Sequence, residues 1–501
     1  MIADQDLLSI QQARILAENA HEAQKKLREF SQERLDAIVS AIAEEVVAHT
    51  EALAVMSQEE TGCGNWRDKC VKNKFVCLQV SAAIRSMRCV GIISRDAEQQ
   101  TMNVGVPVGV IAAICPVTSP VSTAIYKTLI AIKSGNAIIF SPHPRAIKSI
   151  SHVLDIMIDA AQRVGLPEGC LAYMNKVSKS GTLELINHRH TGMVLLTGVP
   201  GIYEKAVMGT KPIIYGGVGN GPAFIERTAN IDRAVKDVIA SKTFDNGIAP
   251  SAEQSVVIDG AISGEVKAAF IKYGAYYMCE EEAEKILKLF FYTDGRRKKD
   301  AVGLDAAALI KRAGITTAPD NVKLLLAQRE FISDLDPYSR GFMAPVLPVY
   351  IEDDWMGACE KCIELLLFER KAHIMIIHST DESVIEQFAL RKPVARMLVN
   401  TPACFGAMGM TTNLFPSMTL GSGSTGHGIT ADNVSPMNLI YIRKVGYGTK
   451  TVDSLPLCEC DAVSTSTTDR TFLSTQENAP LIALQRLIAE AFEGIDKTLI
   501  K

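Results

Sequence analysis

Hydrophobic residues recur every three or four positions through most of residues 6–87, as in LSIQQARILAENAHEAQKKLREF and QERLDAIVSAIAEEVVAHTEALAVM. This spacing places apolar side chains on one face of a helix, so it predicts a helical start to the chain. The pattern changes near residue 88. RCVGIISRD and TMNVGVPVGVIAAICP are β-branched runs interrupted by glycine, and they predict strands joined by a short polar turn.

Apolar strands and amphipathic helices then alternate. VGVIAAICP, NAIIFSPHP and GMVLLTG are predicted strands, and TAIYKTLIAIKSG and AIKSISHVLDIMIDAAQRVG are predicted helices. This alternation is typical of an α/β protein with a doubly wound parallel sheet, in which ligands bind beyond the carboxyl ends of strands. A second α/β segment begins near residue 236. Its predicted strands are SVVIDG, KAAFIKYG, APVLPVYIE, AHIMIIHS, ARMLVN and, late in the chain, NLIYIRKVGYG.

The pattern changes again after the last predicted strand. Residues 451–479 are rich in Ser and Thr and predict a linker. Residues 480–501 begin with Pro480, a good first-turn residue, and their apolar side chains from Leu481 to Ile495 share one helical face. A terminal helix of this kind must dock on its own body, on another subunit or on another partner.

Composition narrows the class of protein. The chain has 501 residues, of which 47% are hydrophobic and 22% charged, as expected for a globular protein with two or three domains. A net charge of −4 without a long basic run argues against nucleic acid or an anionic membrane as a partner. Neither a secretory signal nor an apolar run of membrane-spanning length is present, so a cytoplasmic location is expected.

The cysteines predict reduced, buried thiols rather than a metal centre. Twelve are scattered along the chain, mostly in apolar or helical surroundings. Cys359 and Cys362 have CxxC spacing, but a zinc site needs two more ligands and no second pair follows nearby. Helical packing explains this pair better, and no metal is expected.

Six blocks carry a family resemblance. They are EETGCGNWRDKCVKNKF, GVIAAICPVTSPVSTAIYKTLIAIKSGNAIIFSPHPRA, KPIIYGGVGNGPAFIE, SKTFDNGIAPSAEQ, RMLVNTPA and NLFPSMTLGSGSTGHGITADNVSP. In this order and spacing, between residues 20 and 448, the chain resembles the CoA-acylating branch of the aldehyde dehydrogenase family, of the acetaldehyde or propionaldehyde dehydrogenase type. That branch converts a short-chain aldehyde, coenzyme A and NAD to an acyl-CoA and NADH.

The resemblance implies the aldehyde dehydrogenase fold. A Rossmann-like cofactor domain is expected over residues 1–235, an α/β catalytic domain over 236–430 and an oligomerisation strand over 431–450. A hairpin near 88–107 is expected to join that strand in a β arm between subunits. A homodimer or homotetramer is therefore implied.

The nucleophile loop departs from the family pattern. Pro250 stands where the resemblance places the catalytic cysteine, and a proline has neither a nucleophilic atom nor a backbone N–H. Ser119 stands at the position of the oxyanion asparagine, and a hydroxyl is shorter than an amide. Ser251 is adjacent to the expected position, but no base that could activate it is visible in the loop. Cys115 and Cys404 are alternative thiols, and core packing explains them better.

The segments that the resemblance assigns to cofactor binding follow the family pattern more closely than the nucleophile loop does. In SPHPRA, His143 and Arg145 are polar candidates near the adenosine ribose, with a simple turn as the alternative. In TGVPG, a turn at a helix start offers N–H groups to phosphate, although Val199 replaces a glycine. Gly341 stands for a ribose-binding glutamate, and His373 matches a family position. The cofactor-binding residues that the resemblance implies are Thr118, Pro142, His143, Arg145, Thr197, Gly198, Gly201, Gly217 and Gly341.

Two hypotheses on function follow. One is an NAD-dependent acylating aldehyde dehydrogenase with coenzyme A as co-substrate and an aldehyde as the other small-molecule partner. The other is a catalytically silent or impaired relative that acts as a binding, scaffolding or regulatory subunit, because Pro250 and Ser119 replace two catalytic groups. Residues 480–501 resemble the encapsulation peptides of bacterial microcompartment enzymes, which makes a shell or another cargo protein a candidate partner.

Overall fold

The nearly continuous apolar runs beyond residue 108 form the first of two parallel sheets. The computed structural model describes residues 4–217, 219–368 and 373–452. Residues 1–446 form one compact unit, and the second unit, 447–501, is described only as far as Val452. The first sheet has the strand order β5-β4-β3-β6-β7. Its strands are β3 (Val110–Ile114), β4 (Ala137–Ser141), β5 (Leu171–Tyr173), β6 (Thr191–Thr197) and β7 (Ile213–Gly216).

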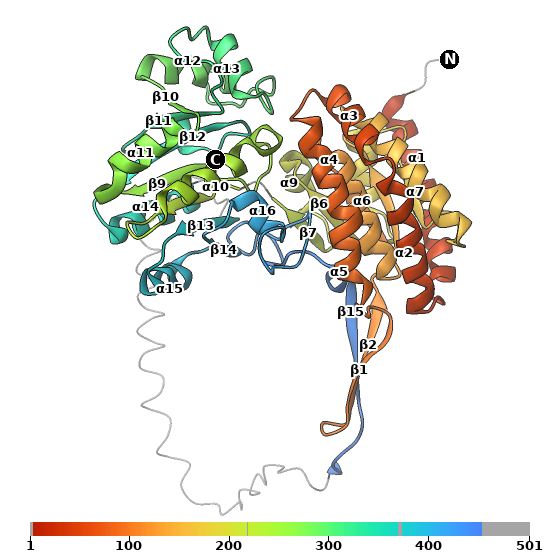
Figure 1. The fold of residues 1–501 in the computed structure, drawn as a ribbon. Helices are drawn as coiled ribbons and strands as arrows, with labels where there is room; N and C mark the ends of the chain where they lie inside the picture. Colours follow the sequence, from red (N-terminus) through yellow and green to blue (C-terminus); the bar gives the residue numbers. More distant parts are fainter. Residues whose placement is uncertain (1–3, 218, 369–372, 453–501) are drawn as a thin grey trace, which may run out of the picture. The chain divides into compact units, whose positions relative to one another are not determined.

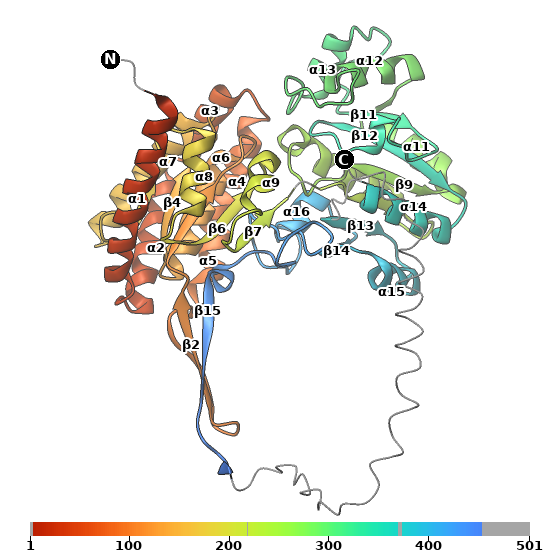
Figure 2. The same ribbon diagram turned by 180° about the vertical axis from the view of Figure 1, so that it is seen from behind.

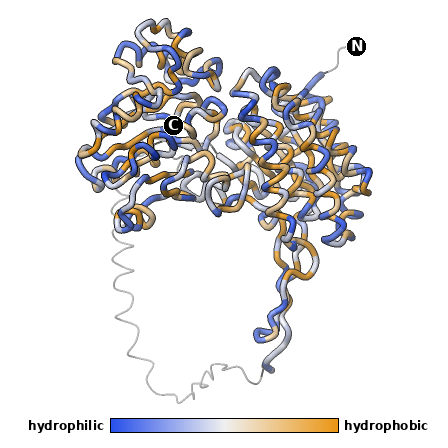
Figure 3. Tube along the Cα trace, viewed as in Figure 1, coloured by the Kyte–Doolittle hydropathy of each residue, from blue (hydrophilic) through white to orange (hydrophobic). Residues whose placement is uncertain are grey.

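Amphipathic helices pack around this sheet (Figures 1 and 2). The helices are α1 (Gln5–Leu27), α2 (Gln32–Val47), α3 (Thr50–Thr61), α4 (Trp66–Phe75), α5 (Ser81–Arg85), α6 (Pro120–Lys133), α7 (Ile147–Arg163), α8 (Lys179–Asn187) and α9 (Pro200–Ala206). Hydrophobic and hydrophilic residues alternate along most of these helices (Figure 3), whereas α6, which lies against the sheet, is buried along its whole length. Side-chain caps fix the first turns of several helices. At the start of α2, for example, the Ser31 hydroxyl accepts a hydrogen bond from the backbone N–H of Arg34.

The second parallel sheet has seven strands in the order β10-β11-β12-β9-β8-β13-β14. They are β8 (Pro222–Ile225), β9 (Ser255–Asp259), β10 (Ala275–Tyr277), β11 (Leu324–Gln328), β12 (Val346–Glu352), β13 (Ile374–His378) and β14 (Arg396–Val399). The accompanying helices are α10 (Ile231–Thr243), α11 (Ser263–Lys272), α12 (Glu280–Phe290), α13 (Ala306–Ala313), α14 (Trp355–Phe368), α15 (Glu382–Arg391) and α16 (Ala403–Ala407). The predicted α/β architecture is thereby confirmed.

A three-stranded antiparallel sheet joins distant parts of the sequence. It contains β1 (Gly91–Asp96), β2 (Thr101–Pro107) and β15 (Ile440–Gly446), with β2 in the middle. β15 pairs with β2 along its whole length, from Ile440 opposite Pro107 to Gly446 opposite Thr101. This arm extends away from the helices of the first sheet (Figure 1).

Two expectations from the sequence need correction. KAAFIKYG is not a strand, because the chain forms α11 there and buries Val266, Ala269 and Phe270 at helical spacing. β8 lies within the range expected for the cofactor domain, yet it pairs with β9 and β13 of the second sheet. Sheet membership therefore changes before Pro222 rather than at residue 235. The predicted helix over 480–501 and most of the linker over 451–479 lie outside the described residues.

The thiols follow the expected pattern in the described ranges. The ten cysteines there are free, and all except Cys279 are buried. Cys359 and Cys362 lie on the inner side of α14, as helical packing predicts. Within the same ranges, no helix combines the length and apolarity needed to cross a bilayer.

Candidate functional site

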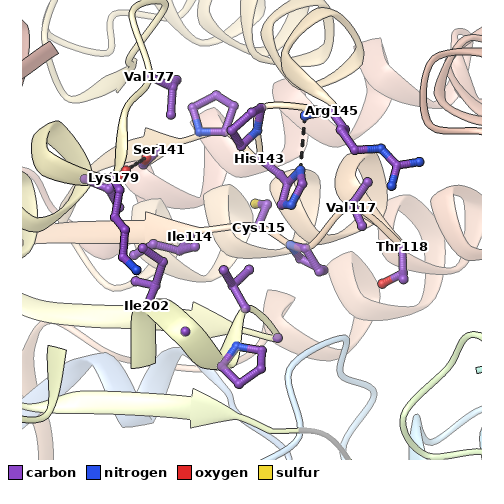
Figure 4. Close-up of a pocket in the computed structure, with 18 of the residues that line it drawn as sticks. Ile114, Cys115, Val117, Thr118, Ser141, His143, Arg145, Val177, Lys179 and Ile202 are labelled. Carbon is purple, nitrogen blue, oxygen red and sulfur yellow. Dashed lines mark hydrogen bonds between the residues drawn. The ribbon is translucent and has the colours of Figure 1, made fainter. Parts of the chain in front are cut away.

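A large pocket opens at the carboxyl ends of β3, β4 and β6, where ligands bind in doubly wound sheets. Its volume is about 550 Å³. Each strand ends in a loop that turns away from the sheet, and these loops supply most of the lining (Figure 4). The residues that line it from the three loops and the start of α9 are Cys115, Pro116, Val117, Thr118, Pro142, His143, Pro144, Arg145, Gly198, Val199, Pro200 and Gly201.

The charged side chains of the large pocket are all cationic. Arg145 comes from the loop after β4, Lys179 from the start of α8 and Lys299 from the second half of the chain, and His143 lies beside Arg145 on its loop. No aspartate or glutamate is among the described residues that line it. Burial, Arg145 and Lys299 together lower the pKa of His143. Such a lining favours a ligand that carries negative charge.

Arg145 and His143 hold the loop after β4 in place. The Arg145 guanidinium donates to the carbonyl oxygen of Thr61 at 2.7 Å, and its backbone N–H donates to Nδ1 of His143 at 3.1 Å (Figure 4). SPHPRA is thus a structured turn between a strand and α7, and its polar side chains lie at the pocket wall.

The turn after β6 contains a strained residue. Val199 has φ +50° and ψ +60°, in the left-handed region that favours glycine, and it precedes the first turn of α9. A β-branched residue rarely adopts this conformation. Val199 lines the large pocket, so its isopropyl group occupies space that a glycine would leave open.

A smaller inner pocket of about 80 Å³ adjoins the large one. The two share the lining residues Pro116, Thr118, Gly198 and Met343. The inner pocket combines hydroxyl groups with thioethers and other apolar groups. The residues that line it alone are Lys72, Ser119, Thr123, Thr197, Gly216, Gly217, Ala249, Pro250, Ser251, His373, Met408, Met418 and Leu420.

Pro250 and Ser251 sit on the loop that precedes β9. Pro250 lines the inner pocket, and Ser251 is buried near the thiol of Cys404. Burial raises the pKa of the Cys404 thiol to about 12 and that of Cys115 to about 11, so both stay protonated near neutral pH. Cys404 is not among the described residues that line either pocket.

A buried ionic cluster supports this loop from the side of α4. Asp245, with φ +49°, accepts hydrogen bonds through Oδ2 from Lys69 at 3.1 Å and Lys72 at 2.5 Å. All three side chains are at most 4% exposed. Lys72 also donates to Ser119 Oγ at 2.9 Å, and Lys69 donates to the carbonyl oxygen of Thr118 at 2.7 Å. The cluster therefore fixes both the loop and the start of α6.

His373 is a neutral group at the edge of the inner pocket. Burial lowers its pKa to about 3, with a smaller contribution from the Arg396 cation. Its Nε2 lies 3.3 Å from the carbonyl oxygen of Leu420, and its Nδ1 has no hydrogen-bond partner among the described residues. Because Nε2 must carry the proton to donate, Nδ1 is left as an acceptor.

The structure brings most of the predicted site residues to these two pockets. Thr118, Pro142, His143, Arg145, Gly198 and Gly201 line the large pocket, and Ser119, Thr197, Gly217, Pro250 and Ser251 line the inner one. Gly341 lines neither. A Cβ at Gly341 would lie 2.8 Å from Oε1 of Gln254, so this position faces protein rather than a pocket.

Sequence reasoning missed several lining residues. Lys179, Lys299 and Met343 reach the pockets from segments far from the matched blocks. Lys72 lies within one of those blocks, and its spacing from Lys69 on α4 was the available signal. Nothing in the sequence alone shows that this helix face meets Ser119.

The two parallel sheets with their surrounding helices define an α/β protein with a doubly wound cofactor-type fold. The profile of the aldehyde dehydrogenase family matches residues 1–281. The chain belongs to the aldehyde dehydrogenase family, as the resemblance predicted.

Several relatives are aldehyde-alcohol dehydrogenases. The chain is 36% identical over 408 residues to an aldehyde-alcohol dehydrogenase from Streptococcus pneumoniae, covering 80% of this chain and 46% of that protein. It thus spans about half the length of the aldehyde-alcohol dehydrogenases it matches.

Two solved structures are similar over most of the chain. One is an acetylating aldehyde dehydrogenase from Geobacillus thermoglucosidasius, with 39% identity and a TM-score of 0.87 over 90% of this chain and 99% of that one. The other is a propionaldehyde dehydrogenase from the fucose utilisation bacterial microcompartment of Clostridium phytofermentans, with 29% identity and a TM-score of 0.78 over 86% and 96%. These likenesses support the resemblance to the acylating branch and confirm the aldehyde dehydrogenase fold.

Proposed function

We propose that this chain binds a nicotinamide dinucleotide and coenzyme A in the large pocket and a short aldehyde in the inner pocket, with cysteine-dependent acyl transfer impaired or lost. The proposal depends mainly on Pro250, which lines the inner pocket at the position where the resemblance places the nucleophile. A saturated ring cannot attack a carbonyl. The chain then serves as a binding, scaffolding or regulatory subunit.

The large pocket suits a nucleotide. Its volume of about 550 Å³ lies within the usual range for cofactor sites, and its cations Arg145, Lys179 and Lys299 suit phosphate groups. NAD is the expected dinucleotide, and when bound it accepts a hydride. Val199 narrows the turn at the start of α9, so weak binding is expected.

The residues near Pro250 do not supply an obvious replacement nucleophile. Ser251 lies near the Cys404 thiol, which stays protonated near neutral pH and cannot act as its base. The hydroxyl of Ser119 accepts from the Lys72 ammonium, which lowers its nucleophilicity and leaves its own O–H free to donate. Ser119 is therefore a donor to an oxygen atom, not a second nucleophile.

A second candidate is full acylating activity on a short-chain aldehyde, with NAD and coenzyme A. The acetylating and propionaldehyde dehydrogenases of similar fold favour it. It requires a nucleophile from outside the described lining of the inner pocket.

The proposal also includes the association of this chain with other subunits. The β1-β2-β15 arm exposes Tyr441 and Ile442 on β15, which favours a homodimer or homotetramer built through this sheet. The microcompartment origin of one structural relative favours a shell or cargo partner for residues 480–501.

The test is NADH formation by the full chain with propionaldehyde, coenzyme A and NAD. A Pro250→Cys, Ser119→Asn double variant is measured beside it, and a Ser119→Asn single variant serves as control. We expect no NADH formation by the natural chain and measurable NADH formation by the double variant. Rapid NADH formation by the natural chain would exclude the hypothesis that acyl transfer is impaired, and it would support the second candidate.

A further inference from the structure

Cys359 and Lys392 bring a sulfur and an amine into direct contact outside both pockets. Cys359 lies in the first half of α14, and Lys392 directly follows α15. Nζ of Lys392 lies 2.5 Å from Sγ of Cys359, and it also donates to the carbonyl oxygen of Cys359 at 3.1 Å. Neither residue is among the described lining of the large or the inner pocket. Two hydrogen bonds to one residue thus hold the amine against the sulfur.

The surroundings of this pair favour a reactive sulfur. Cys359 is 4% exposed and Lys392 8% exposed, so a small oxidant can reach them, whereas Cys362 is fully buried. The Lys392 ammonium also lies 4.0 Å from the centroid of the Phe388 ring, and no carboxylate of the described residues forms an ion pair with it. The sulfur is therefore the group that can carry a negative charge beside this ammonium. A thiolate next to a lysine is the form of cysteine that peroxide oxidises.

Cys362 is the nearest thiol in the sequence, but the helix holds it in an unsuitable place. α14 runs without a break through both cysteines. Residues three apart in a helix have Cβ atoms about 5–6 Å apart. A disulfide needs about 3.5–4.5 Å between them. Burial also raises the pKa of the Cys362 thiol, so it stays protonated. The amine of Lys392 is therefore better placed than Cys362 to capture an oxidised Cys359.

We infer that Cys359 is an oxidation site whose sulfenic acid is captured by Lys392 in a sulfenamide cross-link. Hydrogen peroxide is the oxidant. The thiolate sulfur attacks one peroxide oxygen, the O–O bond breaks, and the hydroxide that leaves takes a proton from the Lys392 ammonium to form water. The neutral amine nitrogen then attacks the sulfur, the S–O bond breaks, and a second water leaves with one amine proton. Sulfur is oxidised and the peroxide is reduced to two molecules of water.

The cross-link changes how this part of the chain is connected. It joins α14 to the end of α15 through residues 33 positions apart, and the loop that it closes contains β13. A thiol reductant cleaves the S–N bond and restores both side chains, so the modification is reversible. The inference does not depend on the proposed function, because neither pocket takes part.

Peptide mapping of the full chain after treatment with hydrogen peroxide tests the inference. Free thiols are blocked with N-ethylmaleimide in urea before digestion with chymotrypsin. The peptides that contain Cys359 and Lys392 are expected as one cross-linked species, lighter by two hydrogen atoms than their sum, with Cys362 blocked. Dithiothreitol is expected to separate them. Oxidation of the exposed Cys279 shows that the dose of peroxide suffices.

Three variants separate the amine from the second thiol. Lys392→Arg keeps the positive charge and removes the nucleophilic amine, so it is expected to lose the cross-link and to leave at Cys359 a sulfenic acid that dimedone traps. Lys361→Arg is the matched control, because it makes the same change on α14 at a lysine that pairs with Glu352. It is expected to cross-link as the natural chain does, and so is Cys362→Ser.

A disulfide between Cys359 and Cys362 would overturn the inference. So would an unmodified Cys359 at a dose that oxidises Cys279, or the loss of the cross-link in Cys362→Ser. If Lys392→Arg does not fold, the peptide map of the natural chain and the Cys362→Ser variant still decide.

Discussion

The strained turn at Val199 gives a quantitative prediction. In the left-handed conformation a side chain with a Cβ costs about 1–2 kcal/mol, whereas glycine carries an extra unfolded-state entropy of about 0.5–1 kcal/mol. Val199→Gly and Val199→Ala both remove the partly buried isopropyl group. The packing free energy lost is therefore nearly the same in both variants and nearly cancels when their stabilities are compared. The glycine variant is therefore expected to be more stable than the alanine variant by about 0.5–1 kcal/mol.

Urea unfolding of the two variants measures this difference, provided that both transitions have the same m-value. Titration calorimetry with NAD measures the second consequence. Removing the isopropyl group from the wall of the large pocket is expected to tighten NAD binding by about tenfold, equivalent to about 1.4 kcal/mol. An alanine variant as stable as the glycine variant would refute the strain at this turn. Unchanged NAD affinity in the glycine variant would refute the crowding.

Three further predictions concern buried polar groups. Asp245→Asn leaves two buried lysines without their carboxylate and is expected to cost about 3 kcal/mol or more in urea unfolding; a loss below about 1 kcal/mol would contradict the ion pairing. Tyr126→Phe removes hydrogen bonds to Ser417 and to the carbonyl oxygen of Val434, and a loss of about 1–3 kcal/mol is expected by the same assay, whereas neutrality would contradict those bonds. Burial lowers the pKa of Lys127 to about 8, so the unfolded chain binds more protons between about pH 8 and 10.5 and stability from this group rises with pH. Relative to a Lys127→Met variant, the natural chain should gain stability from pH 8 to 10; a flat difference would contradict the shift.

Much of the fold could be predicted because its periodicities are strong. The buried strands β3 and β4 are continuous apolar runs, and α7 alternates apolar and polar residues at helical spacing. α11 was mistaken for a strand because the short window KAAFIKYG hides the spacing that begins at Val266. The position of β8 depends on which neighbour it pairs with, which one strand's composition does not reveal.

The candidate site was predicted unevenly for a physical reason. Pro250, Ser119 and the SPHPRA turn lie in matched blocks, so their positions could be assigned residue by residue. The contact between Lys72 and Ser119 joins two helices, and its 2.9 Å distance follows from their packing rather than from either segment. Gly341 lies outside the six matched blocks, and a Cβ at this position would meet the side chain of Gln254. The binding roles of these residues stay predictions.

The pairing of β15 with β2 also constrains how the chain is made. β2 ends at Pro107 and meets a partner that the ribosome synthesises more than 300 residues later. The side-chain amide of Asn136 likewise donates to the carbonyl oxygen of Leu439, which is synthesised about 300 residues later. Until residues 434–446 emerge, β2 has a bare edge, and the helices of the first sheet lack their last hydrogen-bond partners. Nascent chains thus hold an open strand edge through most of translation, which makes this arm the place where premature pairing between neighbouring copies is expected.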